Sequence, residues 1–126
     1  MLRQYRKLGD WDKGREAARR ALRGIDRDKD EHTMANIMYE TSELYLQTGE
    51  YGQAREMACG AALRYAKRGE KRRLGRALFV AARAAKELHR YDDAVSYSKK
   101  AAEIYRGIGL SDGKEYQDFR KFIDGL

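Results

Sequence analysis

The chain has 126 residues, of which 42% are hydrophobic and 37% are charged, and its net charge is +7 at pH 7. This length and composition indicate one folded domain with one core and argue against disorder. No apolar run is long enough for a membrane span, and the first residues lack the apolar stretch of a secretory signal, so we expect a cytoplasmic protein. With a single cysteine and no metal-ligand spacing or catalytic motif, no metal, cofactor or enzymatic activity is expected.

An all-α fold is predicted, because proline is absent and good helix formers such as Ala, Arg, Glu, Lys and Leu dominate. Tight turns are expected between the helices. In chain order, the predicted helices span residues 1–8, 11–26, 31–48, 51–68, 71–88, 91–108 and 113–124.

Glycines mark both the ends and the interiors of these helices. Four fall at predicted helix ends: Gly9, Gly49, Gly69 and Gly109. Glycine suits these positions because it tolerates the left-handed conformation of a C-terminal cap. Three fall inside predicted helices: Gly52, Gly60 and Gly75. Each costs a helix about 1 kcal/mol relative to Ala, so these glycines either permit close helix contact or mark weak helices.

A 40-residue repeat organises the chain. Its copies begin at Leu8-Gly9-Asp10-Trp11, Thr48-Gly49-Glu50-Tyr51 and Leu88-His89-Arg90-Tyr91. Small residues follow each aromatic residue by three, seven and ten positions: Gly14, Ala18 and Ala21; Ala54, Ala58 and Ala61; Ala94, Ser98 and Ala101. This spacing places them on one helical face, which predicts close packing of each unit's second helix on its first. The leading aromatic residue is expected to fill the elbow between the two helices.

The start Gly49-Glu50-Tyr51-Gly52-Gln53-Ala54, with the later Ala61, resembles the second helix of the tetratricopeptide repeat family. The unit is longer than the family's usual length of about 34 residues, and the proline that commonly closes a unit is missing. The resemblance implies a right-handed α-solenoid of about three helix-turn-helix pairs and a C-terminal capping helix. Within one domain, 1–126, the units span 1–28, 31–69 and 71–109, and the terminal helix 113–124; the short first helix suggests a fragment of a longer array.

The sharpest functional signal is a basic stripe on the predicted helix 71–88. One face of this helix is apolar and is expected in the core: Leu74, Ala77, Leu78, Ala81, Ala85 and Leu88. The opposite face carries Arg72, Arg76, Phe79, Arg83, Lys86 and, just past the helix end, Arg90. Residues 64–90 hold ten Lys or Arg against two Glu, a local charge of +8, so the basicity is concentrated. The family resemblance implies that this face lines a concave, ligand-binding groove.

The repeat extends this groove to the neighbouring units, because a shift of 40 residues aligns Phe79 with Tyr39 and Phe119, and Arg83 with Glu43. Aromatic rings beside guanidinium groups suit an acidic or aromatic peptide. We therefore expect a protein-protein interaction module. Its expected partner-binding residues are Arg76, Phe79, Arg83, Lys86, Tyr39, Asn36, Glu43 and Arg72. Glu43 is expected to pair with Arg83 or Arg76 across the groove.

Three alternatives to peptide binding stay open. In the first, the basic stripe is only a solvated face with no ligand. In the second, the stripe binds nucleic acid without sequence preference, as the high isoelectric point suggests. In the third, the chain is a structural oligomerisation segment of a larger regulatory protein. The last alternative, and a possible homodimer, rest on apolar residues in the final helix: Phe119, Phe122 and Ile123. A solenoid cap normally presents a polar outer face instead.

Overall fold

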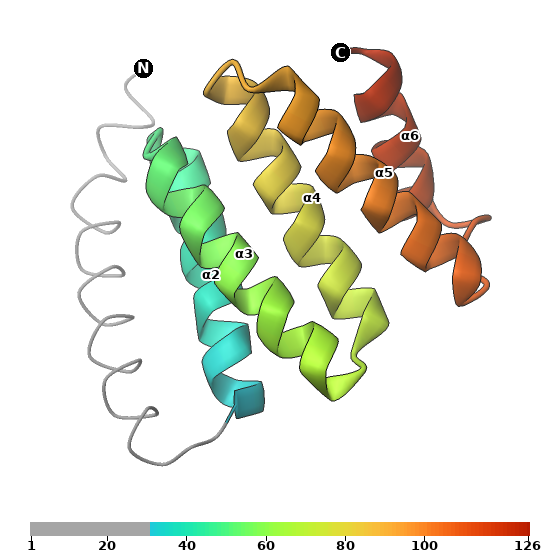
Figure 1. Ribbon diagram of the computed structural model, residues 1–126, viewed down its shortest axis with the longest axis horizontal. Helices are drawn as coiled ribbons and strands as arrows, with labels where there is room; N and C mark the ends of the chain where they lie inside the picture. The colour runs from blue at the N-terminus through green and yellow to red at the C-terminus, as the bar shows by residue number, and fades with distance from the viewer. Residues whose placement is uncertain (1–30) are drawn as a thin grey trace.

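The computed structural model describes residues 31–126, so the first predicted unit, with Trp11 and the small residues that follow it, lies outside the described residues. The regular structure of the described part is entirely α-helical (Figure 1). Its helices are α2 (Glu31–Thr48), α3 (Tyr51–Arg68), α4 (Lys71–Glu87), α5 (Tyr91–Gly107) and α6 (Lys114–Asp124). Every bound agrees with the predicted one to within one residue. The all-α prediction is therefore confirmed for this part of the chain.

Each helix packs on the next one along the chain, from α2 through to α6, and α2 also contacts α4. Consecutive helices run antiparallel in a solenoid-like arrangement, and α2 lies behind α3 in the view of Figure 1. The odd-numbered helices α3 and α5 alternate with α2, α4 and α6, and the latter three bring their side chains to a common groove. No helix in residues 31–126 is long and apolar enough to cross a membrane.

Left-handed residues close the turns between the helices, as the glycine positions predict. Gly49, Gly69 and Gly109 have φ values of 82°, 71° and 79°. His89 takes the same conformation, with φ 60°, one repeat after Gly49. At the end of α3, the Gly69 N–H donates to the Ala66 carbonyl at 3.1 Å, which satisfies an acceptor that the helix leaves free.

The predicted small-residue faces of α3 and α5 are buried. Those of α3 are Ala54, Ala58 and Ala61, and those of α5 are Ala94, Ser98 and Ala101; all six have 0% exposure. The Ser98 hydroxyl donates to the Ala94 carbonyl at 2.7 Å, so this polar group is satisfied inside the core. The predicted close packing of each second helix is confirmed for these two units.

Two of the three interior glycines permit close helix contact. A Cβ at Gly75 would lie 2.5 Å from Cε1 of Tyr105, and one at Gly60 would collide with the terminal methyl group of Met38. No neighbouring atom would lie within 4 Å of a Cβ at Gly52. Close helix contact therefore explains Gly60 and Gly75, whereas Gly52 makes no such contact and only weakens the first turn of α3.

The leading aromatic residue fills the elbow in one unit but not in the next. Tyr51 is partly buried and packs on the cluster around Tyr45. Tyr91 is 47% exposed, so the expectation is wrong there. The Tyr91 ring turns instead toward the preceding turn, where its hydroxyl lies 3.0 Å from His89 Nδ1.

Candidate functional site

Three adjoining hollows form one groove between α2, α4 and α6, which we call the inner groove. The first has a volume of about 310 Å³ and is lined by Asn36, Tyr39, Glu40, Glu43, Tyr65, Arg73 and Arg76. The middle one, of about 120 Å³, shares Tyr39, Glu43 and Arg76 with the first and adds Phe79, Val80, Arg83, Glu115, Asp118 and Phe119. The last, of about 330 Å³, is lined by Leu46, Tyr51, Phe79, Arg83, Lys86, Glu87 and Phe122. The structure thus brings seven of the eight predicted partner-binding residues into one groove; Arg72 lies just beyond it.

The basic stripe divides into paired and unpaired cations. Arg76 makes a two-pronged ion pair with Glu115 of α6, with Nε 2.7 Å from Oε2 and Nη2 3.1 Å from Oε1. Arg72 reaches the same carboxylate at 3.3 Å. The hydrogen bonds from Arg76 lower the pKa of Glu115, and those to Glu115 raise the pKa of Arg76. Two of the predicted ligand-binding arginines therefore already hold a carboxylate of the chain itself.

Arg83 and Lys86 have no such partner: within residues 31–126, neither forms an ion pair, and both are exposed. Each lies over an aromatic ring instead. The Arg83 guanidinium is 5.8 Å from the centre of the Phe79 ring, and the Lys86 ammonium is 5.5 Å from that of Phe122. A cation–π contact at an exposed site contributes about 0.5–1 kcal/mol and leaves the N–H donors available. These two residues are thus the cations that an anionic ligand can reach.

Aromatic rings from α4 and α6 pack together beneath these cations. The Phe79 ring centre lies 4.8 Å from that of Phe119 and 5.3 Å from that of Phe122. Phe119 also packs edge-on to Tyr105 at 4.8 Å and is only 2% exposed. Phe119 belongs to the core and offers almost no surface for self-association. Phe122 and Ile123 are partly exposed, and a role for them in self-association stays a prediction.

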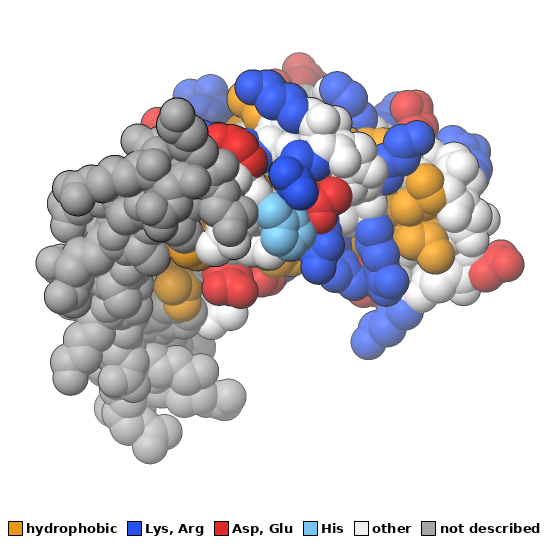
Figure 2. All heavy atoms as spheres, turned by 90° about the horizontal axis from the view of Figure 1, so that it is seen from below, with side chains coloured by type: hydrophobic (Ala, Val, Ile, Leu, Met, Phe, Trp, Pro, Cys, Tyr) orange, Lys and Arg blue, Asp and Glu red, His pale blue; other side chains and the backbone are white. Residues whose placement is uncertain are grey.

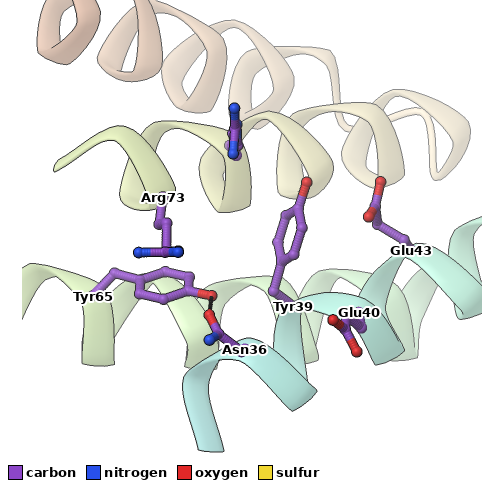
Figure 3. A pocket seen from close by; sticks show the side chains of 7 residues that line it. Asn36, Tyr39, Glu40, Glu43, Tyr65 and Arg73 are labelled. Atoms are coloured by element: carbon purple, nitrogen blue, oxygen red, sulfur yellow. Dashed lines mark hydrogen bonds between the residues drawn. The ribbon is translucent and has the colours of Figure 1, made fainter. Parts of the chain in front are cut away.

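The α2 side of the groove is organised by tyrosines. The Tyr65 hydroxyl donates to Asn36 Oδ1 at 2.5 Å (Figure 3), and Asn36 Nδ2 lies 3.2 Å from His32 Nε2. Burial, and next the negative charge of Glu43, raise the pKa of Tyr39 to about 12. Tyr39 therefore keeps its proton and presents an O–H donor to the first hollow at neutral pH.

The expected pairing of Glu43 with Arg76 or Arg83 is not found. Glu43 forms no ion pair in the described part of the chain, because Arg76 is taken by Glu115 and Arg83 lies over Phe79. Glu40, next to Glu43 on α2, is likewise without an ion-pair partner among residues 31–126. Two carboxylates that line the groove therefore have no ion pair in the described residues; Glu40 is exposed and Glu43 is partly buried.

Sequence reasoning missed Glu115 and Tyr65, although the repeat contains a signal for both. Residue 115 follows Arg76 by 39 positions, about one repeat, so the alignment of Phe119 with Phe79 already places it beside the stripe. Tyr65 recurs after 40 residues as Tyr105, whose hydroxyl donates to the Arg72 carbonyl at 3.4 Å. Both tyrosines thus reach from a second helix to the first helix of the same unit.

Among residues 31–126, no three His, Cys, Asp or Glu side chains are grouped closely enough to hold a metal ion together. Cys59 is partly buried, and its thiol donates to the Tyr97 hydroxyl at 3.6 Å.

No protein-family model matches the sequence, and no curated protein matches it. The geometry of the inner groove therefore carries the functional argument.

Proposed function

We propose that the chain is a non-enzymatic, cytoplasmic protein-binding module that holds a segment of a partner in its inner groove. The fold would be a right-handed α-solenoid of the tetratricopeptide repeat type, a variant with a 40-residue unit. One observation carries the proposal: the groove runs along α4 and ends in two exposed cations, Arg83 and Lys86, that lie over aromatic rings without carboxylate partners in the described residues.

The chemistry at this end of the groove suits a partner that combines acidic and aromatic side chains. Arg83 offers a planar fork of N–H donors that matches a carboxylate, and Lys86 adds a second positive charge. The partly buried rings of Phe79 and Phe122 offer apolar area for an aromatic side chain. Aromatic residues bury much surface at a small entropic cost, which favours them as anchors in such a groove.

Charge reversal at the two free cations tests the proposal. The probe is a fluorescein-labelled six-residue peptide in which glutamate and phenylalanine alternate, and binding is followed by fluorescence anisotropy. We expect Arg83→Glu with Lys86→Glu to weaken binding at least about tenfold, because two attractions become repulsions. The matched control is Lys99→Glu with Lys100→Glu on the exposed face of α5, which makes the same change in net charge away from the groove. Equal weakening by both pairs, or by neither, would refute the assignment of the groove.

Nucleic-acid binding is the second candidate, and the basic face favours it. Figure 2 shows Lys and Arg side chains gathered on one face of the described part, with Asp and Glu among them. Much of this charge is paired: Arg68 and Arg73 each lie 3.1 Å from Glu70, and Arg72 and Arg76 bind Glu115. Affinity for a single-stranded DNA probe should fall steeply with salt if phosphates bind here. Absence of binding at low salt would remove this candidate.

A further inference from the structure

The last helix of the chain, α6, presents an acidic side chain to the basic stripe of α4. The Glu115 carboxylate accepts hydrogen bonds from Arg76 at 2.7 and 3.1 Å. It also lies 3.3 Å from Arg72, one turn earlier on α4. A carboxylate held by arginine forks is the contact that this stripe would make with an acidic ligand. Glu115 therefore occupies the place of the acid that we expect from a partner.

Two aromatic side chains of α6 lie against the same stripe. Phe119 and Phe122 follow Glu115 by four and seven positions, which places all three on one face of the helix. Both rings pack on Phe79, with centres 4.8 and 5.3 Å from that ring. The Lys86 ammonium lies 5.5 Å from the centre of the Phe122 ring. The contacts of α6 with α4 thus have the acidic and aromatic chemistry that the groove suits.

Of the described helices, α6 has the least support from the rest of the fold. It has 11 residues, whereas each of the others has 17 or 18. Phe119 is its one buried residue, whereas α3 and α5 each bury five. A helix shorter than about 12 residues is marginal by itself, and elements with few buried contacts open at the lowest free energy. Figure 1 shows α6 at the end of the array, beside α5. Opening of α6 therefore disrupts less packing than opening of any other described helix.

We propose that the stripe of α4 binds a helical partner segment in which an acidic residue is followed four and seven residues later by aromatic residues, and that α6 is the chain's own occupant of this site, which the partner displaces. This inference rests on the proposed function and deepens it, because it names the partner's pattern and a competition that controls access. The partner's first aromatic ring would replace Phe119 between Phe79 and Tyr105, so the packing lost with α6 is restored. While α6 is docked, the apparent affinity for such a partner is reduced by the fraction of molecules that are open.

A peptide with the sequence of residues 112–126 tests the competition, because it carries the proposed pattern. The peptide is labelled with fluorescein, and its binding to the full-length chain is followed by fluorescence anisotropy. Glu115→Gln in the protein weakens the docking of its own α6, and we expect it to bind the peptide about fivefold more tightly than wild type does. The matched control is Asp124→Asn, which removes one negative charge from an exposed position of the same helix and should bind like wild type. A peptide with glutamine in place of its Glu115 should bind more weakly to all three proteins.

Amide hydrogen exchange shows directly whether α6 leaves its place. The wild-type chain is labelled with nitrogen-15 and observed by NMR, so the signals of the unlabelled peptide do not overlap with those of the protein. At saturating peptide, exchange should accelerate in α6 (Lys114–Asp124) and not in α3 to α5. Unchanged or slower exchange in α6 would mean that the peptide binds beside this helix, and the inference would be wrong.

The affinities overturn the inference separately from the proposed function. Equal affinity of wild type and Glu115→Gln, or no binding by Glu115→Gln, excludes α6 as a competing occupant. The alternating glutamate and phenylalanine peptide judges the proposed function, because its binding depends on Arg83 and Lys86 and does not require α6 to move. Circular dichroism verifies that the Glu115→Gln and Asp124→Asn variants are folded, and the exchange experiment on wild type needs no variant.

Discussion

Replacing Gly75 by Ala tests how tightly the two helices that position the groove are packed. The new Cβ would lie 2.5 Å from Cε1 and 2.8 Å from Cδ1 of Tyr105, closer than carbon atoms can approach without a shift. Tyr105 is 1% exposed, and the Phe119 ring stands 4.8 Å away on another side. The ring therefore has no free space to enter, so α4 and α5 must separate or Tyr105 must leave its rotamer.

Two opposing effects set the size of the change. Alanine favours a helix interior by about 1 kcal/mol over glycine, whereas an added methyl group in a packed core costs about 1–3 kcal/mol. The net expectation is a loss of about 1 kcal/mol in the free energy of unfolding. The other interior glycines supply controls. Gly52→Ala meets open space and should stabilise the protein by about 0.5 kcal/mol, and Gly60→Ala meets the flexible end of Met38 and should lie between the two.

Urea denaturation followed by circular dichroism measures the three variants against wild type. The expected order of stability is Gly52→Ala, then Gly60→Ala, then Gly75→Ala, with wild type above the last. A Gly75→Ala protein as stable as wild type, together with a stabilised Gly52→Ala protein, would refute the argument that Gly75 exists to admit the Tyr105 ring.

Three further changes have outcomes set by single interactions. His89→Gly should raise the free energy of unfolding by about 1 kcal/mol, because φ is 60° there and a side chain disfavours this conformation; a loss of stability in urea denaturation would contradict this. Glu115→Gln should cost no more than about 1 kcal/mol at pH 7, because the ion pair with Arg76 is part exposed. Since hydrogen bonds from Arg76 lower the folded pKa of Glu115, its stabilisation is present above the unfolded pKa of about 4.3 and is lost as the pH falls through the folded pKa. The stability gap between wild type and variant should therefore narrow as the pH falls below about 4.3, and a gap that stays constant from pH 7 to the pH of acid unfolding would disprove the linkage. Tyr65→Phe removes the donor to Asn36 and should cost about 1 kcal/mol, measured by thermal unfolding, whereas an unchanged midpoint would show that this hydrogen bond contributes nothing net.

Helix bounds and close packing were predictable from the sequence because both depend on local signals. Gly49, Gly69 and Gly109 end helices through their own backbone freedom, and the 40-residue register of small residues identifies the buried faces of α3 and α5. The exposure of the Tyr91 side chain was not predictable in this way. Its position in the repeat matches that of Tyr51, but its environment depends on the neighbouring His89, which stands where the preceding unit has Gly49.

The core face of α4 was predicted in part. Ala77, Leu78, Ala81 and Ala85 are buried as expected, but so are Val80, Ala82 and Ala84, and Leu74 and Leu88 are only partly buried. A helical wheel assumes one buried face, whereas α4 is packed between α3 and α5 and also contacts α2. The alanines on its remaining sides allow this enclosure, since they let three helices approach one another closely.

The groove shows why the residue types of a helix face do not by themselves predict which charged side chains a ligand can reach. From the sequence, five cations of α4 and the loop beyond it look equivalent, and Glu43 looks like their counter-ion. In the structure Glu115, which lies 39 positions downstream of Arg76, binds both Arg76 and Arg72, and Glu43 forms no ion pair with the stripe. The charged side chains left without an ion pair among residues 31–126 are Glu40 and Glu43 on α2 and Arg83 and Lys86 on α4, and Glu43 and Arg83 line the same hollow. Pairing is a tertiary property, so a helix that contributes one carboxylate leaves Arg83 and Lys86 as the cations of the stripe that a partner can reach.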